Sequence, residues 1–99
     1  MLTYISLVNY TEQGVTNITD SPDRLDDARE FAESMGGKLK EWYLTFGEND
    51  AVVIAEFPDD ETYAQFMLAV NRTGNVTTTT LKAFTEDEYR DVIAGIPEQ

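Results

Sequence analysis

Cysteine and histidine are both absent from this 99-residue sequence. Without cysteine the chain has no disulfide bond, no thiol nucleophile and no thiolate metal ligand. Without histidine it lacks the commonest metal ligand and the commonest general base. We therefore predict no metal site and no cofactor, and the same absences weaken an assignment as an enzyme.

Basic residues are scarce, with 7 lysines and arginines against 19 aspartates and glutamates, and the net charge is −12. Affinity for phosphate comes from clustered basic side chains, so we expect neither a nucleic-acid partner nor binding to an anionic membrane. The sequence also lacks a basic N-terminal head and a long apolar run. We therefore expect no signal peptide, no membrane span and a cytoplasmic location.

Apolar residues are plentiful, because 41% of the chain is hydrophobic and 11% is aromatic. A disordered acidic tail would contain far fewer such side chains. A chain of this length has enough residues for one modest core. We therefore expect residues 1–99 to form a single domain.

A β-hairpin is the clearest local prediction. Residues 38–46 and 50–57 are rich in aromatic and β-branched side chains, and Gly47-Glu48-Asn49 between them contains residues that tolerate positive φ angles. Residues 2–10 are a third predicted strand, and residues 76–84 are a fourth because their four consecutive threonines disfavour a helix. The strands predicted at residues 2–10 and 50–57 carry apolar side chains on both of their faces. Both faces of these two strands should therefore be covered.

Three helices are predicted from their starting residues and from apolar side chains at helical spacing. The first begins at Ser21-Pro22, with Ser21 as the N-cap, and ends at Gly36-Gly37. The second runs from Pro58 to Val70, and the third from the capping box Thr85–Glu88 to Ile96. Residues 11–14 are predicted to be a turn. For residues 15–20, an irregular segment and a helical turn both remain open.

One stripe of the first predicted helix is acidic. Four carboxylates at this spacing could hold a hard cation, but no loop of ligands gathers around them. We interpret the stripe as a solvent-facing surface, opposite the apolar one. Its members are Asp23, Asp26, Asp27 and Glu30.

The order of these elements predicts a ferredoxin-like βαββαβ sandwich of the α+β class, followed by a C-terminal helix. Two main helices can cover only one face of a four-stranded antiparallel sheet. The other face is also apolar, and a second copy of the sheet would cover it most simply. We therefore predict a homodimer with two stacked sheets, a dimeric α/β barrel, which could assemble further into larger rings.

Several short motifs, in order along the whole chain, resemble the GYD domain family. They are Tyr10–Gly14, Asp20–Arg24, Gly36-Gly37, Tyr43–Gly47, Pro58–Glu61, Gly74–Val76 and Thr80–Phe84. The resemblance implies a dimeric α/β barrel in a family of mostly unassigned function. The family's central motif is Gly, any residue, Tyr, Asp, whereas this chain has Asn49 where the tyrosine would stand. A function carried by that tyrosine would be absent here.

The end of the hairpin also resembles the Gly-x-Tyr-Asp turn in the ligand-binding domain of feast/famine transcription regulators, which bind amino acids between dimers. In this chain the turn residues are Gly47, Asn49 and Asp50. We interpret them mainly as structural, because Gly permits a strained φ and Asp accepts hydrogen bonds from nearby backbone amides. Contact with an effector is the alternative.

Five residues are candidates for ligand binding in a cavity between the two sheets. Glu56 is the only charge within residues 51–57, and it could anchor a ligand or accept a proton there, or simply reach water at the strand end. Trp42 and Tyr43 face opposite ways, and the one that faces away from the helices could stack on a flat ligand or anchor the subunit interface. Tyr4 and Ser6 could line the same cavity. Lys40 and Lys82 could do so too, but we interpret them as charges that protect edge strands.

Three classes of function follow from this sequence. We favour a small-molecule-binding or sensory domain that acts as a homodimer. The second class is a cofactor-independent monooxygenase or isomerase with Glu56 as base and Tyr4 or Tyr43 as acid. The third is a purely structural oligomer, which a solidly packed dimer interior would support.

Overall fold

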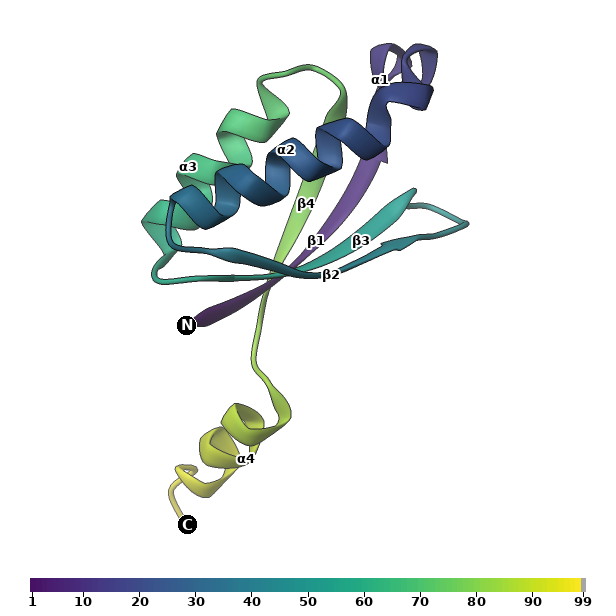
Figure 1. The fold of residues 1–99 in the computed structure, drawn as a ribbon. Coiled ribbons are helices and arrows are strands. Elements are labelled where there is room, and N and C mark those ends of the chain that lie inside the picture. Colours follow the sequence, from purple (N-terminus) through teal and green to yellow (C-terminus); the bar gives the residue numbers. More distant parts are fainter. Residues whose placement is uncertain (99) are drawn as a thin grey trace.

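The computed structural model describes residues 1–98 of the chain. Four strands form one antiparallel sheet in the order β2-β3-β1-β4 (Figure 1). They are β1 (Leu2–Tyr10), β2 (Lys38–Leu44), β3 (Ala51–Phe57) and β4 (Val76–Ala83). This arrangement confirms the predicted ferredoxin-like α+β fold and its four strands.

The two long helices, α2 (Ser21–Ser34) and α3 (Asp60–Asn71), lie side by side on one face of the sheet (Figure 1). α2 follows directly on a 3-10 turn, η1 (Ile18–Asp20), so Asp20 and not Ser21 is its N-cap. The prediction for Ser21 was therefore wrong. Pro22 still lies in the first turn, where its missing N–H leaves no donor unpaired.

A short helix, α1 (Glu12–Thr16), replaces the turn predicted at residues 11–14. Thr11 caps it, because its hydroxyl accepts a hydrogen bond from the Gly14 amide at 3.1 Å. Gly14 packs so closely on the segment before β4 that a Cβ there would overlap the Asn75 carbonyl oxygen. Gly14, which the sequence placed in a turn, is thus needed for a close approach of two backbone segments.

The core lies between the sheet and the two long helices. Alternate residues of β1 and β3 point to this side, and the Tyr4 ring stacks on Tyr63 of α3 with centroids 4.1 Å apart. Phe57 is fully buried beside Phe66, with ring centroids 5.0 Å apart. Gly37 lies against the Phe57 ring, where any Cβ would clash.

On the opposite side of the sheet no helix of residues 1–98 is packed across the strands, and we call this side the bare face (Figure 1). The intervening residues of the two central strands point this way in matched pairs, Ile5 opposite Ile54 and Leu7 opposite Val52. Leu81 of β4 extends the same row and is 49% exposed. The expectation that the helices leave one apolar face uncovered is correct within a single chain.

The C-terminal helix α4 (Glu86–Ala94) stands away from the body on the side of the bare face, joined by a short link (Figure 1). The predicted capping box is present, since Thr85 and Glu88 exchange hydrogen bonds at its start. Its apolar stripe is exposed: Tyr89, Val92 and Ile93 are 57%, 51% and 48% accessible, and Ile96, beyond the end of the helix, is 61% accessible.

Candidate functional site

A cavity of about 330 Å³ lies between the helices and the sheet, and we call it the helix–sheet cavity. The sheet contributes one wall, while α2 and α3 contribute the other two. Most of the lining is apolar. Representative residues are Val8 and Val53 from the sheet, Leu25 and Phe31 from α2, and Met67 and Val70 from α3.

Two of the five candidate ligand residues, Ser6 and Trp42, line this cavity. Ser6 was expected between two stacked sheets, but its side chain points toward the helices of its own chain. For Trp42 and Tyr43 the sequence left open which one faces the helices, and the structure shows that it is Trp42. A bulge at Lys40 changes the alternation of β2, so Leu39 and Trp42 both face the helices although they are three residues apart. Trp42 and Tyr43 do face opposite ways, as predicted.

Tyr4 also points to the helix layer and not to the bare face. Its hydroxyl donates a hydrogen bond to Asp60 Oδ1 at 2.6 Å. Burial, followed by that hydrogen bond to a carboxylate, raises the pKa of Tyr4 well above its usual value. Tyr4 therefore holds its proton, and its position corrects the expectation that it shares a site with Glu56: the register puts Thr3, not Tyr4, opposite Glu56.

Asp60 links the core to the edge strand β4. Its carboxylate accepts hydrogen bonds from Tyr4 and from Lys82, the latter at 3.0 Å, and these bonds lower the pKa of Asp60 below its usual value. Lys82 thus has a specific partner in addition to its place on an edge strand.

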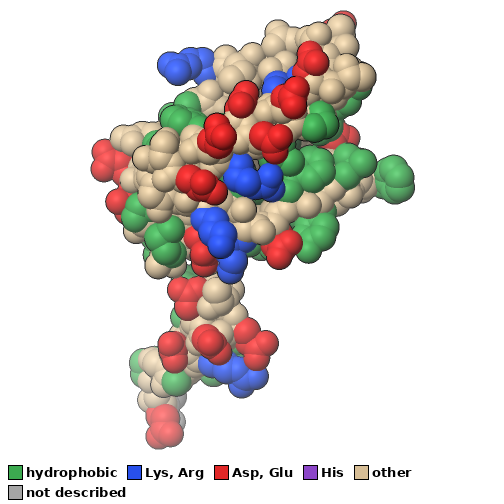
Figure 2. All heavy atoms as spheres, in the orientation of Figure 1, with side chains coloured by type: hydrophobic (Ala, Val, Ile, Leu, Met, Phe, Trp, Pro, Cys, Tyr) green, Lys and Arg blue, Asp and Glu red, His purple; other side chains and the backbone are tan. Residues whose placement is uncertain are grey.

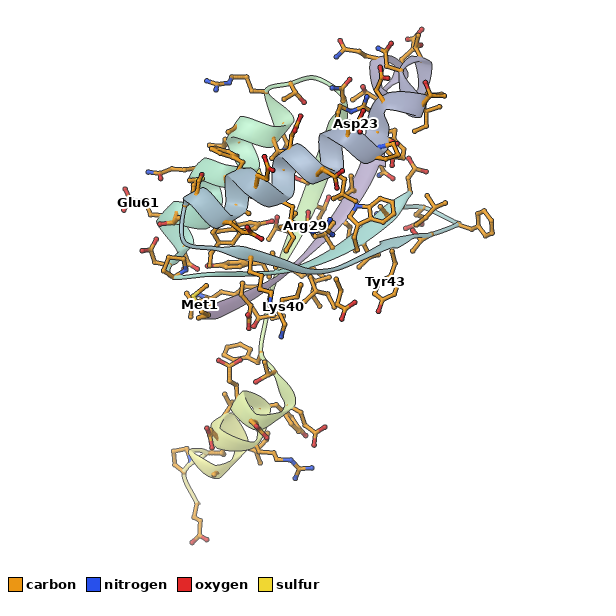
Figure 3. The ribbon with its side chains drawn as sticks, in the orientation of Figure 1. Met1, Asp23, Arg29, Lys40, Tyr43 and Glu61 are labelled. Carbon is orange, nitrogen blue, oxygen red and sulfur yellow. The ribbon has the colours of Figure 1, made fainter. Side chains whose placement is uncertain are left out.

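A depressed pKa in the folded state makes Asp60 a source of acid sensitivity. The stabilisation is present above the pKa of the unfolded chain and is lost as the pH falls through the lower folded-state pKa. We expect Asp60→Asn to lower stability at neutral pH and to lose less stability than the wild type when the pH is lowered to about 3. Urea midpoints at the two pH values measure this. The control is Asp23→Asn on the exposed side of α2 (Figure 3), and equal acid sensitivity in all three proteins would contradict the assignment.

Tyr43 and Glu56 lie on the bare face, away from the helix–sheet cavity. Glu56 pairs with Lys40 at 3.6 Å, and Tyr43 is 55% exposed with its hydroxyl donating to Glu41 at 3.2 Å. Figure 3 shows Lys40 and Tyr43 projecting on the side opposite the helices. The five candidates therefore divide between two sides of the sheet.

The turn residues hold the hairpin against β1. Gly47 has a φ of +101°, a conformation that favours glycine. The Asp50 carboxylate accepts a hydrogen bond from the Tyr10 amide at 2.9 Å, and the Asp50 amide donates to the Val8 carbonyl at 2.9 Å. The Asn49 carbonyl accepts from the Thr45 hydroxyl at 2.7 Å. These contacts are those of a structural turn.

The acidic stripe of α2 is exposed at all four positions, in agreement with its interpretation as a solvent-facing surface. Within residues 1–98, acidic side chains form no group that could hold a metal ion. No helix in the described part of the chain has the length and apolar character needed to cross a membrane.

Sequence reasoning missed Arg24, which lines the helix–sheet cavity. A signal was present: Arg24 lies four residues before Ala28 and seven before Phe31, so it falls on the apolar stripe of α2. Its Nη1 donates to the Asn17 carbonyl at 2.9 Å, while Nη2 is buried without a hydrogen-bond acceptor among the described residues.

Residues 4–93 match the model of the GYD domain. The chain belongs to the GYD domain family. A protein from Thermus thermophilus, named glutamine synthetase and cystathionine beta-lyase binding protein, is 31% identical to this GYD domain over 84 residues. The match covers 84% of this chain and 88% of that protein.

Solved structures similar to this GYD domain include MtbAldR and a feast or famine regulatory protein. MtbAldR superposes with a TM-score of 0.67 at 17% identity, over 86% of this chain and 52% of that one. A feast or famine regulatory protein from M. tuberculosis, complexed with L-methionine, superposes with a TM-score of 0.62 at 19% identity, over 88% and 54%. This GYD domain thus spans about half the length of these two proteins, and the likeness shows a shared fold.

Proposed function

We propose that this GYD domain is a homodimeric small-molecule-binding domain whose ligand occupies the helix–sheet cavity. The observation that carries the proposal is the cavity itself. Small-molecule pockets measure roughly 300–1,000 Å³ and are mostly apolar with a few placed polar groups. At about 330 Å³, with Ser6 and Arg24 in a largely apolar lining, this cavity fits that description. The feast or famine regulator with the same fold, solved with L-methionine, is consistent with the proposal.

The bare face and α4 support the homodimer. An exposed apolar patch on a sheet is typical of a protein interface. α4 has nine residues, and isolated helices shorter than about 12–15 residues are marginally stable in water. A second copy of the chain would cover both the bare face and the apolar stripe of α4.

A thermal-shift screen of amino acids and aromatic carboxylic acids tests ligand binding. A ligand at about 100 times its Kd should stabilise the fold by roughly 2.7 kcal/mol. Ala28→Leu adds volume within the cavity and should weaken that ligand by at least about tenfold, since overpacking costs roughly 1–3 kcal/mol. Ala64→Leu on α3, outside the cavity lining, is the matched control. Binding that is unchanged in Ala28→Leu would place the ligand elsewhere.

Protein binding is a second candidate, favoured by the name of the Thermus thermophilus relative. Hydrophobic side chains gather over the end of the hairpin, where Leu44 is 66% exposed and Phe46 is fully exposed (Figure 2). Co-elution with purified glutamine synthetase, lost in Phe46→Ser, together with a ligand screen without any stabilising compound, would favour this candidate over the first.

A further inference from the structure

Arg24 enters the helix–sheet cavity from the first turns of α2. Its guanidinium is held in place because Nη1 donates to the Asn17 carbonyl, at the C-terminal end of α1, at 2.9 Å. Nη2 is buried, and no atom of residues 1–98 accepts a hydrogen bond from it. A buried donor left unpaired is destabilising, and more so when the group is charged. Arg24 lines the cavity although Nη2 itself is not exposed there, so a small rotation of the guanidinium would bring Nη2 to an acceptor from outside the chain.

Among the residues that the structure describes, Arg24 has no acidic partner, which is unexpected in this composition. The chain has 19 carboxylate side chains, yet the ion pairs within 4.0 Å among the described residues involve Arg29, Lys40, Lys82 and Arg90. Arg29, one turn further along α2, pairs with Asp26 at 3.9 Å. Arg24 thus differs from its neighbour in facing the cavity and in lacking a paired carboxylate.

The lining around Arg24 restricts the kind of anion that would fit. Phe31, Trp42 and Val70 supply apolar surface for the body of a ligand. One further charged side chain, Asp27, lies at the lining and is exposed. With Asp27 nearby and a net charge of −12, a multiply charged anion such as phosphate would be repelled more strongly than an anion with a single charge.

We propose that the helix–sheet cavity binds a small monocarboxylate with an apolar body. The Arg24 guanidinium donates to the carboxylate oxygens, which are its best-matched acceptors in geometry and charge. The apolar body packs against Trp42 and Phe31. The inference rests on the proposed function, since it names the ligand class for the same cavity.

The test compares acids with uncharged analogues of the same shape. 3-Phenylpropionate and hexanoate are titrated by isothermal calorimetry against their primary amides, with fluorescence of the single tryptophan, Trp42, as a second readout from within the cavity. We expect the acids to bind the wild type at least about tenfold more tightly than the amides, because a hydrogen bond to a charged group contributes about 1.5–3 kcal/mol. An α-amino derivative of each acid shows whether an ammonium group beside the carboxylate is accepted.

Arg24→Gln should remove the preference for acids, whereas Arg29→Gln on the same helix should keep it. Arg24→Lys should retain part of the preference, since it keeps the charge and loses the two-pronged geometry. Equal binding of acids and amides by the wild type, or an unchanged preference in Arg24→Gln, would overturn the carboxylate inference and leave the cavity as a binding site. Failure of every acid and amide to bind or to change Trp42 fluorescence would count against the proposed function as well. The comparison in the wild type decides the question even if Arg24→Gln does not fold.

Discussion

Ile54→Asp should convert the proposed homodimer into monomers. Ile54 lies at the centre of the bare face, between Ile5 on β1 and Glu41 on β2. In a single chain this position is only partly covered, so the new carboxylate can reach water and the fold should survive. In the dimer the same charge would be buried without a partner, which costs several kcal/mol. Light scattering at micromolar concentration should give half the wild-type mass.

The matched control is Leu68→Asp. Leu68 is an apolar residue of α3 that is 63% exposed on the helix side of the sheet, so its replacement should leave the dimer intact. Ile93→Asp in α4 then asks whether that helix takes part in the interface. A wild type that is already monomeric at micromolar concentration, or an Ile54→Asp dimer of full mass, would show that the bare face is not the subunit contact.

The sequence predicted the order of helices and strands along the chain, and their layers, well because those depend on local patterns. Alternation in β1 separates Tyr4 and Val8 from Ile5 and Leu7, and the structure places these pairs on opposite faces. Alternation does not say which pair meets the helices, because both are apolar. That choice depends on tertiary packing, above all the stacking of Tyr4 on Tyr63.

The side of the sheet on which Trp42 lies was left open for a related reason. The bulge at Lys40 reverses the alternation within β2, and nothing in the local sequence marks it. An alternating pattern therefore cannot say whether Trp42 or Tyr43 faces the helices. Arg24, by contrast, was visible as a charge on an apolar stripe, but arginine is so often a surface residue that its position carries little weight until the buried Nη2 is seen.

Phe57→Ala should be the most destabilising single substitution in the core. Phe57 is fully buried, and its ring lies 5.4 Å from that of Tyr63 and 5.0 Å from that of Phe66. Truncating a buried phenylalanine costs about 3–5 kcal/mol, against a total of roughly 5–15 kcal/mol for a typical domain. The Gly37 backbone lies directly against the ring and cannot move in to fill the space without shifting the end of α2.

Urea unfolding of Phe57→Ala and Phe46→Ala measures the difference between two identical substitutions. Phe46 is fully exposed on the hairpin, so its loss should change the free energy of unfolding by no more than about 0.5 kcal/mol. Because the stability of a homodimer depends on subunit concentration, all variants must be compared at one concentration. A midpoint for Phe57→Ala that matches Phe46→Ala would mean that the aromatic cluster does not support the helix layer, and the cavity between helices and sheet would then lose its structural basis.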